Sequence, residues 1–186
     1  VKHFDWVQRM TDDVIARLSE HLPDLGCRLA MDSKAIASYG QPVRDEKKKG
    51  KRDGRRDLDA DHGRKTYRGV REDGSAWEKI VKWYGYKLHL LVDSRYELPL
   101  AFRVTKASVA DVTEAIPLVK AHAKRNPEVA KRADRLSGDK GYDSGELNEE
   151  LHEKHGIKPV IDTRRMWKTE KTRPVVKDRV DSFVHD

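Results

Sequence analysis

The sequence predicts an α+β or α/β domain built on a mixed sheet, with helices on its faces and a long basic insertion after the first strand. Three observations carry this prediction. Residues 83–92 and 98–105 are rich in branched and aromatic side chains and flank a short turn, which is typical of an antiparallel hairpin. Two further short apolar runs end abruptly at Asp32 and at Asp139. An amphipathic segment over 111–126 separates the hairpin from the second run, as a helical crossover would.

The chain opens with apolar residues near helical spacing, and Pro23 and Gly26 close this helical region. We predict that residues 1–26 are the end of an upstream helical region, that 27–165 form the core, and that 166–186 are a basic C-terminal segment. Because the first residue is Val1 rather than methionine, we expect a fragment of a longer protein.

The first strand is predicted over 29–36, and the insertion over 40–80. Within it, residues 44–57 hold eight basic residues, four acids and no apolar residue. Such a segment buries too little surface to offset the entropy of ordering, so we predict a flexible basic loop. A solubilising linker and a nucleic-acid contact are both open for it. Turn signatures stand at 59–63 and 72–74.

Order is predicted to return at Lys82. Pro99 favours an edge position for the second hairpin strand. In the helix that starts near Asp111, Pro117 predicts a kink or a restart. A strand over 135–138 leads to Asp139.

Ser144 is a helix cap and Gly156 follows the end of that helix. A last strand is predicted over 157–161.

The composition favours a polyanionic partner. The net charge is +7 and the isoelectric point about 9.4, which points first to nucleic acid, although many surface lysines alone would give the same balance. The single cysteine excludes an intrachain disulfide and fits a reducing, cytosolic compartment. No apolar run is long enough for a membrane span.

Asp32 and Asp139 are the candidate catalytic and metal-binding residues. If the first and fourth strands lie side by side, their carboxylates share a cleft and offer hard oxygen ligands to Mg²⁺. Two such ions ~4 Å apart support an in-line phosphoryl displacement. Each acid taken singly is equally consistent with an ordinary turn or strand end, because Gly-Asp-Lys-Gly is a turn signature.

Between residues 29 and 165 the sequence resembles a bacterial insertion-sequence transposase of the DDE class, which has a ribonuclease-H-like catalytic domain. The matching stretches are Leu29-Ala-Met-Asp-Ser-Lys-Ala-Ile36, Trp83-Tyr-Gly-Tyr-Lys-Leu-His-Leu90, Glu97-Leu-Pro-Leu100, Thr105-Lys-Ala-Ser-Val-Ala-Asp111, Gly138-Asp-Lys-Gly-Tyr-Asp143 and Lys158-Pro-Val-Ile-Asp162.

The resemblance implies that Asp32 and Asp139 are the first two catalytic aspartates. They would coordinate two Mg²⁺ (or Mn²⁺) ions for strand cleavage and strand transfer at the element's ends. The resemblance also implies that the partner is DNA, both at the element's ends and at the target, and that the protein acts as a homodimer on paired ends. It further implies a location in the bacterial cytoplasm, associated with the nucleoid.

The family's third acid, a glutamate on a helix well downstream, has no match here. Glu146, Glu149, Glu150 and Glu153 follow Asp139 too closely, and Glu170 lies in a basic, aperiodic stretch. We expect that the chain ends before this acid and that the fragment alone is inactive. A decayed gene lacking the acid is the alternative.

The basic segments on both sides of the acids are candidate DNA contacts. The predicted DNA-binding residues are Lys47, Lys48, Lys49, Lys51, Arg52, Arg55, Arg56, Lys140, Tyr142, Arg164 and Arg165.

Other candidate residues are weaker. His152 and His155 suit a metal by spacing but a solvated helix end by context. His89 is predicted to pack in the hairpin, although its strand face would also allow it to reach the cleft. Trp77, Trp83 and Trp167 border basic segments, where indoles either stack on splayed bases or simply pack.

Two rival functions remain at this point. Another ribonuclease-H-like nuclease would hydrolyse DNA or an RNA–DNA hybrid without strand transfer. A non-catalytic basic DNA-binding protein would need no metal and would leave the two aspartates far apart.

Overall fold

The computed structural model describes residues 4–40 and 57–163. It divides into two compact units. The first, called the core unit, comprises 1–32, 89–103 and 111–186, and the second, called the ribbon unit, comprises 33–88 and 104–110.

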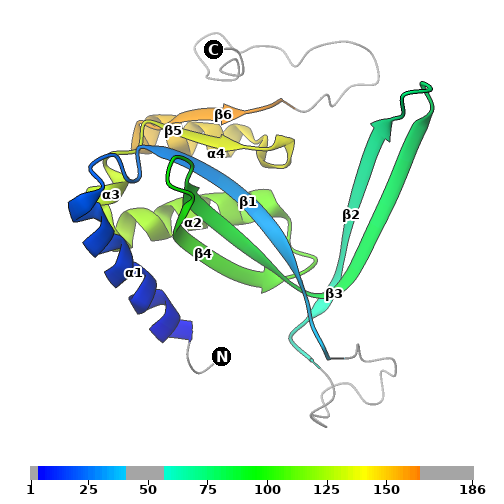
Figure 1. Cartoon of the computed structure of the whole chain (residues 1–186), viewed down its shortest axis with the longest axis horizontal. Coiled ribbons are helices and arrows are strands. Elements are labelled where there is room, and N and C mark those ends of the chain that lie inside the picture. The colour runs from blue at the N-terminus through cyan, green and yellow to red at the C-terminus, as the bar shows by residue number, and fades with distance from the viewer. Residues whose placement is uncertain (1–3, 41–56, 164–186) are drawn as a thin grey trace. The chain divides into compact units, whose positions relative to one another are not determined.

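Six strands share one sheet, whose hydrogen-bonded order is β2-β3-β1-β5-β6, with β4 paired to β3 (Figure 1). The strands are β1 (Arg28–Ala37), β2 (Asp61–Val70), β3 (Ala76–Asp93), β4 (Leu98–Lys106), β5 (Arg135–Gly138) and β6 (Lys158–Ile161). β5 is parallel to both β1 and β6. The first and fourth predicted strands, β1 and β5, are therefore neighbours, as the sequence led us to expect.

The core unit is held together by one apolar cluster. Leu29 and Met31 of β1 and Leu136 of β5 point into it, as does Ile161 of β6. These buried positions alternate with more exposed ones, which is the period of a strand with one face on a core. Leu100 and Ala101 of β4 complete the strand side of the cluster, and both are about 1% exposed.

Helices contribute the other side of this cluster. In α2 (Asp111–Arg125), Ala115, Leu118 and Val119 are buried. α2 is one continuous helix through Pro117, so the predicted restart does not occur. A short helix, α3 (Pro127–Ala130), follows it. In α1 (Phe4–His21), Ile15 is 3% exposed and belongs to the same cluster.

The last helix begins where the sequence predicted. The Ser144 hydroxyl accepts the backbone N–H of Leu147 at the start of α4 (Gly145–Glu149), as an N-cap does. The chain then widens into a π-helical turn, η3 (Glu150–Lys154), before Gly156 at φ +66 ends it. Leu147 and Leu151 are both buried, in agreement with the predicted inward face.

Asp93 closes the hairpin between β3 and β4. Its carboxylate is 0% exposed and accepts the backbone N–H groups of Gly26, Arg95 and Tyr96 at 2.7–2.9 Å. The three donors satisfy a buried carboxylate without a cation. The short turn predicted between residues 92 and 98 is therefore confirmed, and Asp93 also joins it to the loop before β1.

In the ribbon unit, the prediction for residues 57–81 is wrong. Residues 57–81 were expected to be loop and turns, with order returning at Lys82. Instead β2 and the first half of β3 form a long antiparallel pair, from Asp61 opposite Gly85 to Val70 opposite Ala76. The sequence did not predict these strands because both faces of the pair are largely exposed, and the residues therefore do not alternate between apolar and polar. The turn predicted at 72–74 is confirmed, with Gly74 at φ +81.

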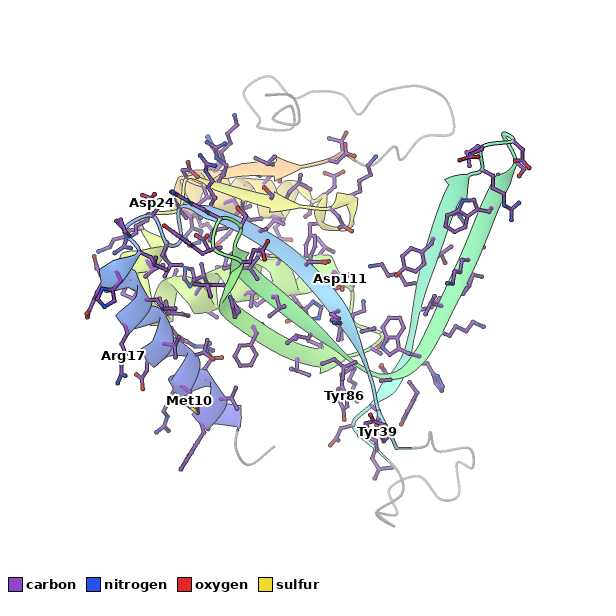
Figure 2. The ribbon with its side chains drawn as sticks, viewed as in Figure 1. Met10, Arg17, Asp24, Tyr39, Tyr86 and Asp111 are labelled. Atoms are coloured by element: carbon purple, nitrogen blue, oxygen red, sulfur yellow. The ribbon has the colours of Figure 1, made fainter. Side chains whose placement is uncertain are left out.

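Asp57 anchors the base of this ribbon. Its carboxylate accepts hydrogen bonds from the hydroxyls of Tyr86 and Ser38, each at 2.7 Å. The Tyr84 hydroxyl donates to the Asp57 carbonyl. The hydrogen bond from Tyr86 is the main reason that the pKa of Asp57 is lowered. Figure 2 labels Tyr86 at this base. These bonds hold Ser38, after β1, beside Asp57, before β2.

None of the helices within 4–40 and 57–163 combines the length and the apolar character needed to cross a membrane.

Candidate active site

Asp32 and Asp139 lie at matching positions on two neighbouring parallel strands. The last registered pair of β1 and β5 is Met31 with Gly138, and each aspartate is the next residue. Neighbouring strands are ~4.8 Å apart, and residues level with each other on parallel strands project to the same face. Both acids are exposed. The two side chains are therefore expected on one face of the sheet, about one strand spacing apart.

The glycines around Asp139 determine its local geometry. Asp139 precedes a single 3₁₀ turn, η2 (Lys140–Tyr142), and its Oδ1 accepts the N–H of Gly141 at 2.7 Å. A Cβ at Gly141 would stand 2.6 Å from that oxygen, so the close approach requires glycine. Tyr142 packs against Gly138, where an added Cβ would be 3.3 Å from the ring. The Gly-Asp-Lys-Gly-Tyr sequence thus holds the carboxylate of Asp139 in one orientation.

A third acid, Asp162, follows the next strand in the same way. Gly138 pairs with Ile161, so Asp162 is level with Asp139. The Lys140 ammonium contacts the Asp162 carboxylate at 2.6 Å. Sequence reasoning did not select Asp162 as a site residue, although it ends an apolar run just as Asp32 and Asp139 do.

The other predicted site residues fall into two groups. Tyr142 is 1% exposed and belongs to the core cluster, so the predicted DNA contact through Tyr142 is wrong for this structure: a buried ring offers no surface to a phosphate. Lys140 is exposed and stays a prediction. The remaining predicted DNA contacts lie outside the described residues: Lys47, Lys48, Lys49, Lys51, Arg52, Arg55, Arg56, Arg164 and Arg165.

Histidines do not build a metal centre in the part of the chain that the structure describes, where no group of three or more His, Cys, Asp or Glu side chains is gathered for an ion. His89 is 1% exposed, with its Nδ1 3.8 Å from the Asp111 carboxylate. It is therefore packed, as predicted. His155 lies 3.6 Å from Glu150.

Glu150, one of the acids that follow Asp139, forms ion pairs with two lysines. It is 6% exposed, and its carboxylate contacts Lys154 at 2.7 Å and Lys120 of α2 at 3.1 Å. The Lys154 ammonium, followed by that of Lys120, lowers the pKa of Glu150 to about 2. These contacts connect η3 to α2, which identifies Glu150 as a structural ion-pair residue.

A pocket at the other end of the same strands is not part of this site. It is lined by Asp24, Cys27, Arg28, Arg95 and Asp134. Arg28 begins β1, and Asp134 directly precedes β5, whereas the two aspartates follow the carboxyl-side pairs. In open α/β sheets, ligands are bound outside the carboxyl ends of the strands.

The comparison with protein families agrees with this geometry. Residues 24–185 match the transposase DDE domain. Most of the chain is covered, so the chain belongs to this family, the DDE transposases. The mixed sheet with β1 beside β5 is accordingly the ribonuclease-H-like fold of these enzymes. No curated protein and no solved structure matches the sequence.

Membership in the family carries a transposase or nuclease type of function, which is a polynucleotidyl transferase activity on DNA. DDE transposases generally use divalent metal ions. The donor set here is compatible with such ions, because Mg²⁺ takes one or two protein carboxylates and completes its shell with water and substrate phosphate.

Proposed function

We propose that Asp32 and Asp139 are the catalytic carboxylates with which this domain cuts and joins DNA in a Mg²⁺-dependent (or Mn²⁺-dependent) reaction at the ends of an insertion element. The observation that carries the proposal is the register: both acids directly follow the last β1–β5 pair, Met31 with Gly138, and are therefore level on neighbouring parallel strands. A non-catalytic DNA-binding protein gives no reason for two exposed carboxylates to be level on adjacent strands.

The reaction consists of two phosphoryl transfers. In the first, water attacks the phosphodiester at the element's end, the P–O3′ bond breaks, and the 3′-oxygen leaves as a hydroxyl. In the second, that 3′-hydroxyl attacks a target phosphodiester, which releases the target's own 3′-oxygen. Divalent ions, when bound, supply the positive charge that stabilises the attacking and leaving oxygens.

The two aspartates would hold the divalent ions and orient them towards the scissile phosphate. Neither aspartate forms a covalent bond to the substrate. Asp139 contributes a carboxylate whose rotation is set by the Gly141 N–H, and Asp32 contributes the neighbouring one. Preorganisation of this kind lowers the cost of binding the ions and the scissile phosphate together. The family's third acid is expected to complete the set, and Glu170 lies outside the described residues.

Substitution of either aspartate tests the assignment. In a chain that carries the family's third acid, Asp32→Ala and Asp139→Ala should each reduce Mg²⁺-dependent cleavage of a labelled element end by about a thousandfold or more, because several kcal/mol of charge stabilisation is lost. DNA binding should change little. Asp134→Ala, an exposed acid at the opposite end of β5, is the matched control and should cleave normally.

A metal-binding measurement separates chemistry from folding. Electron paramagnetic resonance measures the binding of Mn²⁺. The wild-type chain and Asp134→Ala should bind Mn²⁺, and both aspartate variants should not. Cleavage that persists in either aspartate variant contradicts the proposal. Strand transfer should require a donor with a free 3′-hydroxyl; an enzyme that only hydrolyses would point to the nuclease alternative.

A further inference from the structure

The β2–β3 ribbon has two chemically different faces. In an antiparallel pair, residues directly opposite each other share a face. One face carries the pairs Gly63 with Trp83, Lys65 with Val81, Tyr67 with Lys79, and Gly69 with Trp77. We call these eight residues the aromatic face. The opposite face carries His62, Arg64, Thr66, Arg68, Val70, Ala76, Glu78, Ile80, Lys82 and Tyr84.

Two indoles cross over glycines on the aromatic face. A Cβ at Gly63 would lie 2.3 Å from a ring carbon of Trp83, and a Cβ at Gly69 would lie 2.6 Å from Nε1 of Trp77. The Trp83 N–H donates to the Tyr86 carbonyl at 3.1 Å. Both indoles are half-buried. Packing on glycine therefore explains where these rings lie, and it leaves part of each ring at the surface.

The middle of the same face is exposed and cationic. Tyr67 is 44% exposed, and the Lys65 ammonium lies 5.6 Å from the centre of its ring. Lys79 stands directly opposite Tyr67. None of the eight residues of the aromatic face is an acid; Asp61, which comes next on the same face beyond Gly63, accepts hydrogen bonds from Ser108. On the opposite face Glu78 pairs with Arg68 at 2.6 Å.

Rings interleaved with ammonium groups suit one class of ligand. Aromatic side chains stack on bases, and lysines neutralise the phosphates between them. Stacking requires bases that are not already paired in a duplex. We propose that the aromatic face of the β2–β3 ribbon binds DNA with unpaired bases. This inference rests on the proposed function, since it takes DNA to be the substrate of this domain.

Binding measured in EDTA tests the inference without catalysis. Fluorescence anisotropy compares the full chain on a labelled single strand and on a blunt duplex of the same length. The double variant Lys65→Gln/Lys79→Gln should bind the single strand at least about tenfold more weakly than the wild-type chain does. Loss of two phosphate contacts should also reduce the salt slope of log K by about 1.4. Duplex binding should fall much less.

The opposite face provides a control with the same charge change. Arg64→Gln/Lys82→Gln removes two cations from one cross-strand pair of the same ribbon and should leave single-strand affinity near wild type. Tyr67→Leu should weaken single-strand binding about tenfold with no change in salt slope. Tyr67→Phe keeps the ring and should restore binding. Thermal unfolding of each variant establishes that the ribbon is intact.

The outcomes separate this inference from the proposed function. Equal losses in the two double variants, equal losses on single strand and duplex, or normal binding by Tyr67→Leu would overturn the ribbon assignment and leave the catalytic aspartates untouched. Failure of the wild-type chain to bind any DNA would contradict the proposed function itself.

Discussion

Gly85 shows how one residue connects the ribbon to the rest of its unit. It has φ +152, and an added Cβ would fall 2.1 Å from the Ile36 carbonyl oxygen and 2.7 Å from the Ser38 nitrogen. Its own carbonyl accepts the N–H of Ala107. No other residue fits a site that is both left-handed and in contact with a neighbouring backbone.

Gly85→Ala should therefore lower the free energy of unfolding by about 3 kcal/mol or more, measured by chemical denaturation. Gly74→Ala is the matched comparison, because Gly74 also has a positive φ but nothing lies within 4 Å of its Cβ position. It should cost only about 1 kcal/mol, the strain of the backbone alone. Equal costs at the two sites would show that the steric contact at Gly85 is unimportant.

At the scale of elements, the β3–β4 hairpin depends on the buried Asp93. Its carboxylate satisfies donors from its own turn and from Gly26, so a single side chain joins the hairpin to the segment that enters β1. At the tip of the ribbon, the carboxylate of Asp73 likewise accepts a backbone N–H of its own turn, that of Ser75, but Asp73 is exposed to solvent.

Asp93→Ala should destabilise the chain by about 3 kcal/mol, because buried N–H groups lose their acceptor. Asp93→Asn keeps an acceptor oxygen and should lose less. Asp73→Ala should change the unfolding midpoint far less than Asp93→Ala, since water replaces the lost bond at the exposed tip. A similar loss for Asp73→Ala and Asp93→Ala in denaturant unfolding would contradict the role of burial.

For the whole core unit, the buried His122 makes stability depend on pH. Burial lowers the pKa of His122 to about 4, from an ordinary value of 6.5. Between these values the unfolded chain takes up a proton that the folded chain excludes. Stability from this residue is therefore complete above pH 6.5 and is lost as the pH falls towards 4.

The free energy of unfolding should fall by about 3 kcal/mol from this residue between pH 7 and pH 4. Denaturant titrations at several pH values measure it. His122→Leu should lack this part of the pH dependence, and His62→Gln, at an exposed position, should retain it. An unchanged pH profile in His122→Leu would show that His122 is not the responsible group.

The part of the fold that could be predicted from sequence is the part with a one-sided apolar pattern. Leu29, Met31 and Leu136 alternate with exposed residues, and Ser144 and Gly156 mark the two ends of a helix. These signals are local, so the residues themselves reveal them. The ribbon could not be predicted, because Arg64, Thr66 and Arg68 are exposed strand residues whose order comes from cross-strand pairing.

The candidate site divides in the same way. The sequence by itself determined that Asp32 and Asp139 each follow a short apolar run, and that the chain resembles a DDE transposase. Only the tertiary structure decided that the two acids are level on adjacent strands, that Asp162 ends a third strand beside them, and that Tyr142 is buried. The register of β1 with β5 pairs residues more than a hundred positions apart, such as Met31 with Gly138, and that of β5 with β6 pairs residues 23 positions apart, so no local pattern encodes either.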